Sequence, residues 1–525
     1  MPDVRASIRE TWRSFSPLEK RNIAIYILGI TLYKFGLEAF NGSIIALATN
    51  RYDYDAIRTN TTAKTFERVG LLVGLNQALQ CVGSILIAPL IQRFPTKTVL
   101  TAAVFVFGLF TAILLIVDAA TGGYIKPADW EAKHKKGDYS YYGTYYTDGI
   151  IPIYCVTGIA YGMVELIRRV IPKDIVGGDV KKLIRMDSLV HICYEVSGTL
   201  GAFATALALI PALGNNMSFI ITPLLYTAAA ITWWFISDLG FQKKKLGKLE
   251  QQPSYIKAIV GGFYLFAASI WTGAKIIFTS RKFIWLFNGY AVALYGHRFL
   301  ENALAPVIAK RYLGESAWSQ VMVGGSNFGE LCGAATVFIL ANYVKTPIPW
   351  LRIDSLTVLI VWYLPFWYPP AGDVRYAWMV AATFIPISFG WAAGDVSISA
   401  YIQGALTRLG KGSKSAVSPL GAVMAFLYST YIIIYAIISP LLGTYLDQVY
   451  ARTGGANGGD VHEAIIYVGG VHFTIIAVCV MSATFIPKGS FSLCPTILSD
   501  EDLEKEGPDE GDNSTELPAG IAAIS

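Results

Sequence analysis

Two distant stretches of the sequence repeat each other, and each places opposite charges inside an apolar run. Residues 32–38 read LYKFGLE and residues 294–301 read LYGHRFLE. A second pair of matching segments, of the form G-x-N-x4-C, follows at 74–81 and 325–332. A charge in lipid costs about 2.5–3.5 kcal/mol on insertion scales, so it usually faces a cavity. The repeat therefore predicts a duplicated membrane protein with charged side chains around an internal cavity.

The composition also indicates a membrane protein. The chain has 525 residues, of which 54% are hydrophobic and 15% are charged, whereas soluble proteins carry about 25% charged residues. A helix needs about 20 apolar residues to cross a bilayer. Twelve such runs occur in two groups of six, at 22–48, 69–91, 98–118, 149–168, 188–212 and 217–237, and at 283–307, 317–343, 351–369, 376–401, 417–445 and 463–486. We therefore predict an all-α membrane protein with twelve transmembrane helices arranged as two six-helix bundles.

The charge distribution predicts the orientation and the division into domains. We expect a cytosolic leader at 1–21, which lacks the cleavage site of a signal peptide, and six-helix bundles at 22–237 and 283–487. A basic cytosolic linker at 238–282 joins the bundles, and an acidic, disordered cytosolic tail at 488–525 follows them. In this arrangement the inner segments hold more than twice as many of the 42 Lys and Arg residues as the outer segments, in agreement with the positive-inside rule.

A thirteenth apolar segment, residues 255–280, lies between the two groups. If this segment crossed the membrane, the positive charges from Arg281 onward would face the wrong side, and the helix at 283–307 would run antiparallel to its counterpart in the first group. We therefore predict an interfacial helix on the cytosolic membrane surface, where Trp271 and Lys257 suit the boundary between lipid and water.

The outer loops are predicted at 50–68 and 119–148. The first contains Asn60-Thr61-Thr62, which makes Asn60 a candidate for glycosylation in a protein of the secretory pathway. The six cysteines have no metal-ligand or disulfide spacing and are expected to pack as small apolar side chains. We expect an integral, multi-pass protein of the plasma membrane, with an internal membrane as the alternative.

The loop between the second and third predicted helices carries a family motif. The major facilitator superfamily has the pattern G-x-L-a-D-r-x-G-r-k-x-x-l in this loop, and residues 88–100 read APLIQRFPTKTVL. Four positions match, among them Arg93 and Lys97, whereas Gln92 and Pro95 replace the Asp and the central Gly of the family. With its two groups of six helices and basic central linker, the chain resembles this superfamily.

The resemblance implies alternating access and a weakened conformational lock. In the superfamily the loop Asp pairs with neighbouring charges and helps to hold one conformation. Because Gln92 cannot form that ion pair, we expect Gln92→Asp to slow turnover at equal expression; faster transport in the variant would contradict this expectation. The residues expected at the gate are Arg93, Lys97, Glu165 and Asp395.

The resemblance also implies that the first, second, fourth, fifth, seventh, eighth, tenth and eleventh helices surround a central cavity. The acidic residues within the predicted helices fall in this set, and we expect none away from the ends of the other four helices. Because buried charge is costly, this distribution favours a charged central site. The acidic residues are Glu38, Glu165, Glu195, Glu301, Glu330 and Asp395.

Spacing within helices predicts two charged clusters. Lys34 and Glu38 are four residues apart and can form a buried ion pair. His297 and Glu301 have the same spacing, and Arg298 can reach Glu301 from three residues away. These groups can bind substrate or protons, or they can merely neutralise each other where the halves pack. Both interpretations stay open.

Further polar residues complete the predicted path for substrate and protons. Glu330 has no partner at helical spacing, and burial without a cation favours a protonated carboxyl group, so Glu330 is a candidate proton carrier. Glu195 can relay protons with His191 or simply line the entrance. Four amides can either bind substrate or hold helices together in lipid: Asn76, Gln77, Gln80 and Asn327.

These features favour a secondary active transporter for a small organic molecule, with proton-coupled export, or proton antiport, as the preferred mode. The sequence contains no G-x-x-x-x-G-K-[ST] loop, which argues against direct drive by ATP. The expected partners are the substrate, membrane lipid and protons, with no nucleic acid. We expect a monomer that is not an enzyme and that holds no cofactor or metal.

Two alternatives stay open. A metal-ion exporter of the ferroportin type would draw ligands from cavity helices, although among the candidates only His191 and Glu195 have a suitable spacing. The alternative of another class is a receptor with a transport fold or a membrane-embedded enzyme. The cavity charges argue against the receptor, and no catalytic constellation of specific spacing supports the enzyme. The candidate metal ligands are His191, Cys193, His297 and Cys332.

Overall fold

The computed structural model describes residues 15–237 and 254–492 together with Pro495, apart from short gaps at 136, 169–170, 177–179, 341–342 and 411–417. Helices make up the regular secondary structure of these residues. Most of the predicted leader, of the basic linker and of the acidic tail lies outside the described residues, as does the side chain of Gln92.

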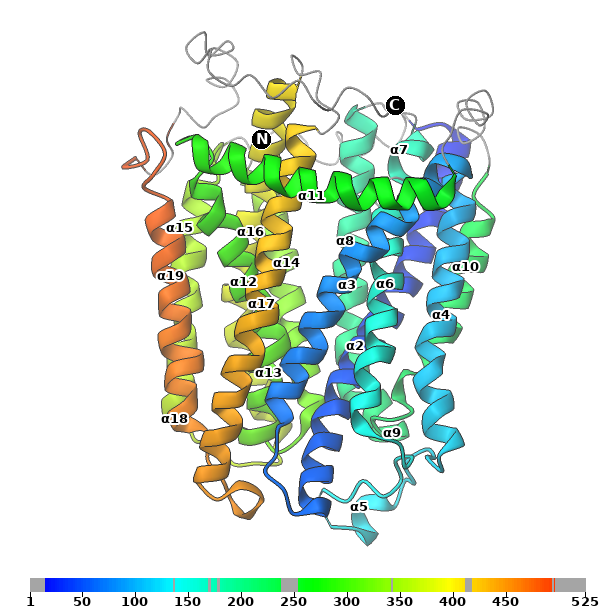
Figure 1. Ribbon diagram of the computed structural model, residues 1–525, viewed down its shortest axis with the longest axis vertical. Coiled ribbons are helices and arrows are strands. Elements are labelled where there is room, and N and C mark those ends of the chain that lie inside the picture. The colour runs from blue at the N-terminus through cyan, green and yellow to red at the C-terminus, as the bar shows by residue number, and fades with distance from the viewer. Residues whose placement is uncertain are drawn as a thin grey trace.

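Six helical segments run the length of the N-terminal half, which is coloured blue to green in Figure 1. The first helix begins after Ser16, whose side chain accepts a hydrogen bond from the Glu19 backbone N–H (3.1 Å), and ends at Asn60 in left-handed conformation. The segments are α2 (Pro17–Thr59), α3 (Thr65–Arg93), α4 (Thr96–Ala120), η1 (Thr147–Gly149) with α6 (Ile150–Arg168), α8 (Val180–Ala204) with η2 (Thr205–Leu209) and α9 (Ile210–Leu213), and η3 (Ser218–Ile220) with α10 (Ile221–Trp234).

The C-terminal half has six corresponding segments. Its first segment alternates between α-helical and π-helical turns, a distortion that often accompanies functional sites; it comprises η5 (Phe287–Val292), α12 (Ala293–Phe299), η6 (Leu300–Leu304), α13 (Ala305–Val307) and η7 (Ile308–Tyr312). The others are η8 (Ser316–Trp318) with α14 (Ser319–Leu340), α15 (Ile348–Thr357) with η9 (Val358–Phe366), α16 (Val374–Gly410), α17 (Pro419–Arg452), and α18 (His462–Ile465) with η11 (Ile466–Val471) and α19 (His472–Ala483).

Twelve of the described segments run along the bundle. By length and apolar composition, ten helices could cross a membrane, and all of these except α11 (Tyr255–Thr279) follow the bundle axis (Figure 1). The remaining three are the shorter Ser218–Trp234, the interrupted segment that begins with η5, and α15 with η9. The protein is therefore an integral, multi-pass membrane protein with the predicted twelve transmembrane segments.

Helix α11 crosses the end of the bundle instead of running along it, and it contacts both halves (Figure 1). Tyr255 at its start donates a hydrogen bond to the Leu86 carbonyl of α3 (3.0 Å), while Gly273, nearer the other end of α11, packs on Ala422 of α17. Its outward face is apolar, with Ile256 74% exposed and Trp271 75% exposed. Such a face suits an interfacial helix; its position on the cytosolic side stays a prediction.

Two pairs of helices join the halves: α3 packs against α17, and α8 packs against α14. In chain order, α3 and α17 are the second and eleventh segments, and α8 and α14 are the fifth and eighth. The second segment of one half therefore packs against the fifth segment of the other half in both pairs, as expected for duplicated halves. Gly74 permits the first contact, because a Cβ atom there would lie 2.9 Å from the Cα atom of Ala436 in α17.

Candidate functional site

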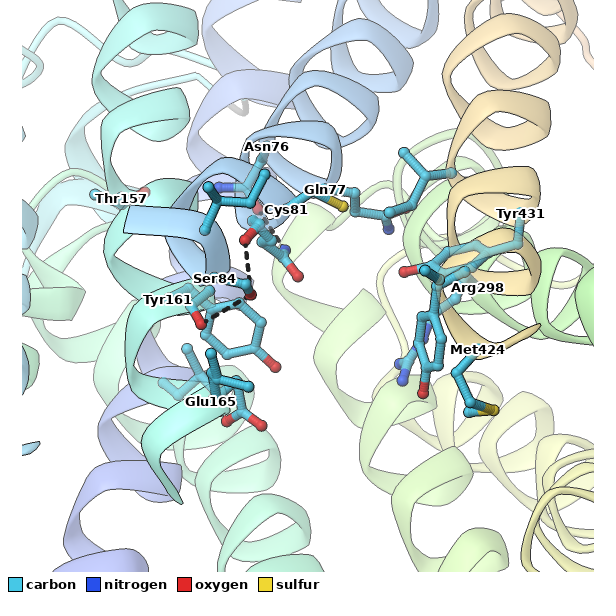
Figure 2. A pocket seen from close by; sticks show the side chains of 18 of the residues that line it. Asn76, Gln77, Cys81, Ser84, Thr157, Tyr161, Glu165, Arg298, Met424 and Tyr431 are labelled. Atoms are coloured by element: carbon cyan, nitrogen blue, oxygen red, sulfur yellow. Dashed lines mark hydrogen bonds between the residues drawn. The ribbon is translucent and has the colours of Figure 1, made fainter. Parts of the chain in front are cut away.

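A cavity of about 1470 Å³ lies between the two halves. Figure 2 shows Asn76, Tyr161 and Glu165 on one side of it and Arg298 and Tyr431 on the other. Residues of α11 also line the cavity, so it reaches the end of the molecule that α11 crosses. Because pockets for drug-sized ligands measure about 300–1,000 Å³, the cavity has room for a small organic molecule together with water.

Polar contacts between the halves close the opposite end, and we call them the distal lock. Arg311 of η7 donates two hydrogen bonds to the Asp53 carboxylate of α2, at 2.6 and 2.8 Å. Asp447 of α17 accepts hydrogen bonds from the backbone N–H groups of Phe66 and Glu67 at the start of α3, at 2.9 and 3.0 Å. Charge-assisted hydrogen bonds are the strong ones, so the distal lock favours closure at this end.

Lys34 and Glu38 form the ion pair that their spacing indicates. Their side chains are 10% and 11% exposed, and both line the cavity from α2. Lys34 Nζ also lies 4.5 Å from the centre of the Tyr194 ring, where cation–π attraction adds to the ion pair.

Two further carboxylates on the cavity wall pair with permanent cations. Arg298 of α12 donates a hydrogen bond to Glu301 Oε2 (2.9 Å), and Ser326 Oγ donates one to Glu301 Oε1 (2.7 Å). In α6, Arg168 Nη2 lies 2.5 Å from Glu165 Oε2. Together with Lys34 and Glu38, these make three neutral pairs around the cavity.

The other two carboxylates on the wall, Glu195 and Glu330, lie beside histidines instead. His297 Nε2 is 2.5 Å from Glu330 Oε1 and 3.5 Å from Glu301 Oε1. His191 Nδ1 is 4.0 Å from Glu195 Oε1. Histidine is the side chain whose unperturbed charge changes between about pH 5 and 8. In the described part of the chain, the ion-pair partners of Glu195 and Glu330 are therefore histidines, which can lose their charge, whereas Glu301 has Arg298 in addition to His297.

The residues predicted for the path converge on this cavity, with His297 one layer behind its surface. The His297 ring stacks on Trp391 of α16, with ring centroids 5.4 Å apart and planes 18° apart, and its Nε2 contacts Glu330 and Glu301, which line the cavity. The predicted path residues that line the cavity directly are Lys34, Glu38, Asn76, Gln80, Glu195, Arg298, Glu301, Asn327 and Glu330.

Some of the amide side chains hold helices together, whereas others have no hydrogen-bond partner among the described residues. Asn76 Nδ2 donates to the Tyr154 carbonyl of α6 (2.7 Å), and Gln80 Nε2 donates to Asn76 Oδ1 (3.0 Å), so these two help to hold α3 against α6. By contrast, Asn327 Nδ2 and Gln77 Oε1 are buried without a hydrogen-bond partner among the described residues. Because buried polar atoms are usually paired, Asn327 and Gln77 are candidates for contact with substrate or water.

The residues predicted for a gate lie toward the α11 end. The Arg93 guanidinium is 5.9 Å from the centre of the Tyr255 ring, and Lys97 Nζ donates to the Ile236 carbonyl (2.7 Å). Asp395 interacts with the Tyr290 hydroxyl, and Glu165 pairs with Arg168 as described above. Their role in gating stays a prediction, as does glycosylation of the exposed Asn60 at the other end.

Sequence reasoning missed the buried acid Asp354. The expectation that the ninth helix holds no acid away from its end is wrong, because Asp354 in α15 is only 7% exposed. The apolar run was predicted to begin at 351, but α15 begins at Ile348, which places Asp354 well inside the helix.

Several tyrosines on the cavity wall also had no assigned role. Tyr194, Tyr428 and Tyr431 line the cavity, and Tyr431 faces the cavity beside Arg298 (Figure 2). The three-residue spacing of Tyr428 and Tyr431 within an apolar helix is the signal that could have indicated a shared polar face.

One group of side chains has the composition of a metal site. His297, Glu301 and Glu330 bring three potential ligand atoms within 4.8 Å of one another, and the described residues contain no second such group. Arg298 already neutralises Glu301 and would repel a cation, so the arrangement fits an ion-pair network better than a metal centre. The other candidate ligands of a metal exporter lie outside the group: His191, Cys193 and Cys332.

Comparison with known proteins relates the fold to transporters. No protein-family model matches the sequence, and no curated protein matches it either. Among solved structures, the nucleoside transporter NupG is 13% identical with a TM-score of 0.52, covering 89% of this chain and 99% of its own. A D-xylose-proton symporter is 11% identical with a TM-score of 0.57, covering 89% and 98%.

A third similar structure is a bacterial homologue of the human drug peptide transporters PepT1 and PepT2. It is 11% identical, with a TM-score of 0.56, and the match covers 91% of this chain and 99% of that one. Identities this low bear on the fold alone. The chain therefore has the twelve-helix fold of the major facilitator superfamily, as the loop motif and the duplicated halves indicated.

Proposed function

We propose that the protein is a secondary active transporter that couples the movement of a small organic molecule to protons. The pairing of charges on the cavity wall carries this proposal: three of five carboxylates have permanent cations, whereas Glu195 and Glu330 have histidines. An uncompensated carboxylate away from bulk water is costly, so loss of charge on a histidine favours proton uptake by its carboxylate. Proton coupling is also in keeping with the similar D-xylose-proton symporter.

Substrate binding and protonation meet at Glu301. The Arg298 side chain is 41% exposed in its pair with Glu301. An acceptor group on the substrate can therefore replace Glu301 as the hydrogen-bond partner of the guanidinium. Glu301 then competes more strongly for the His297 ring, which already lies 3.5 Å from it, and the His297–Glu330 hydrogen bond weakens. Substrate arrival thereby changes the affinity of Glu330 for a proton.

Alternating access follows from opening the distal lock while the cavity closes near α11. A ligand can shift such an equilibrium only by binding one conformation more tightly than the other. The protonation of Glu330 and the partner exchange of Arg298 supply that difference, because both alter contacts between helices that line the cavity.

The finer parts of the proposal rest on the sequence. We propose export over uptake, by antiport with protons, from glycine- and proline-containing fragments such as Ser439-Pro440-Leu441-Leu442-Gly443, which resemble an antiporter motif of the superfamily. We further propose that the protein works as a monomer in the plasma membrane and that Asn60 lies outside the cell.

A metabolite comparison would test the proposal and identify the substrate. Small polar metabolites are quantified by mass spectrometry, inside and outside cells, in a knockout and in knockouts that express wild-type protein or single variants. We expect the wild type and Glu463→Gln, a surface control on α18, to restore the distribution of at least one solute. Glu330→Gln should not restore it. Full restoration by both Glu330→Gln and Glu195→Gln would refute proton coupling through these residues.

A further inference from the structure

A second, much smaller cavity lies behind His297, on the side away from the central cavity. Segments of the C-terminal half enclose it, chiefly α12, α15, α16 and α19. It has room for about one water molecule. Among the residues that line it, His297 and Asp354 are the two with titratable side chains. We call it the Asp354 cavity.

Both titratable groups face the Asp354 cavity with hydrogen-bonding capacity unused. His297 Nδ1 is buried without a hydrogen-bond partner in the described chain, while Nε2 of the same ring bonds to Glu330. The Asp354 carboxylate takes part in no hydrogen bond or ion pair between described residues. It nevertheless lies close enough to His297 for an electrostatic interaction. A water molecule in the Asp354 cavity would satisfy both groups at once.

Asp354 lies where two helices pack closely together. Gly390 brings α16 directly against α15 at this point, because a Cβ atom on Gly390 would lie 2.7 Å from the Asp354 Cα atom. The charged and titratable groups on the surrounding elements are engaged elsewhere. Arg352 binds Thr484, His472 binds Tyr295, Asp395 interacts with Tyr290, and Arg298 pairs with Glu301.

We propose that Asp354 is a second proton-binding site, connected to Glu330 through the His297 ring and one water molecule. The proposal rests on the proton coupling proposed above and extends it to a helix that does not line the central cavity. Protonated Glu330 gives its proton to His297 Nε2, and the proton on Nδ1 passes to the water, which protonates Asp354. No electrons are exchanged: Glu330 becomes a carboxylate, the ring changes tautomer, and reversal restores the first state.

This site would separate the proton from the substrate. While substrate occupies the central cavity, Glu330 can give up its proton without releasing it into the same space, because Asp354 holds it behind the ring. Trp391 stacks on His297 and keeps the imidazole oriented with one nitrogen toward each carboxylate.

Infrared spectroscopy of the purified full-length protein in detergent tests the proposal without a known substrate, since the proton is the probe. Carboxyl bands are recorded across a pH titration in H₂O and D₂O for wild type, Asp354→Asn and the control Ser355→Ala, which changes a neighbouring wall residue without a titratable group. We expect Asp354→Asn to lose one protonated-carboxyl band that both wild type and Ser355→Ala retain. Ala477→Leu, which fills the Asp354 cavity, should keep that band but slow its exchange with deuterium.

The outcomes separate this proposal from the proposed function. If Asp354→Asn leaves every carboxyl band in place while Glu330→Gln removes one, Asp354 binds no exchangeable proton and the extension is wrong, although proton coupling stands. If neither variant removes a band, both proposals are wrong. If Asp354→Asn fails to fold, unchanged exchange in Ala477→Leu would still overturn the water-mediated connection.

Discussion

Lys34 and Glu38 share one buried ion pair, so the removal of either charge leaves the other without a partner. We expect Lys34→Met or Glu38→Gln alone to reduce the free energy of unfolding by about 3–5 kcal/mol, the range typical of breaking a buried pair. The double variant should recover most of that loss. Melting temperatures of the detergent-solubilised wild type, the two single variants and the double variant measure this coupling. If the loss of stability in the double variant equalled the sum of the two single losses, Lys34 and Glu38 would not be coupled.

Residue-scale contacts were predictable where one helix sets the geometry. Spacings of three and four residues indicated the pairs Lys34–Glu38 and Arg298–Glu301, because helical neighbours at these distances share a face. The His297–Glu330 contact joins two helices and has no local signal, since it depends on how α12 packs against α14. Asp354 was missed for a related reason: hydropathy averages over a window and does not report one buried acid.

At the scale of elements, the distal lock should control which end of the molecule is open. A hydrogen bond to a charged group contributes about 1.5–3 kcal/mol, so Arg311→Ala should shift the conformational ratio about tenfold or more toward opening at that end. Cys81 lines the cavity. In a parent protein whose other cysteines are replaced, the labelling rate of Cys81 reports this shift. A membrane-impermeant maleimide applied from the distal side should label it faster in Arg311→Ala than in the parent.

The chain offers a matched control for this prediction. Arg375 is an arginine on the same side whose side chain is 85% exposed in its pair with Asp373, so Arg375→Ala removes a surface ion pair outside the distal lock. Its labelling rate should equal that of the parent. Equal rates in Arg311→Ala and Arg375→Ala would show that the Asp53–Arg311 contact does not hold the cavity closed.

Helix α11 makes a second prediction at this scale. Because it crosses the bundle end, both of its termini should face the same side of the membrane. Single cysteines at Ser254 and Ser280 should therefore react with an impermeant reagent only after cells are permeabilised. Reaction of either one in intact cells would contradict the cytosolic placement, and reaction of only one would make α11 a transmembrane helix.

Hydropathy predicted the existence of the spanning elements better than their ends. The first apolar run was expected at 22–48, whereas α2 extends over Pro17–Thr59. The additional turns carry polar residues such as Asp53, which belong to the distal lock and lie beyond the most apolar part of the helix. Helices continue past the lipid wherever capping and tertiary contacts support them, and composition alone does not reveal this.

For the whole molecule, the duplicated sequence was enough to predict two six-helix bundles, because matching segments imply matching folds. The sequence could not indicate which end of the cavity is closed. That depends on contacts between residues far apart in the chain, such as Asp53 with Arg311 and Phe66 with Asp447, and such contacts change during a transport cycle.

Transport by the purified protein in liposomes tests the central claim most directly. Proteoliposomes receive an extract of small polar metabolites under a pH gradient of either direction, and the solutes inside are identified by mass spectrometry. We predict that wild-type protein accumulates at least one solute against its gradient and that a protonophore abolishes this accumulation. Glu330→Gln should lose the accumulation but still exchange labelled solute across the membrane. Accumulation that does not depend on the pH gradient and that is unchanged in Glu330→Gln would contradict proton-coupled transport through this cavity.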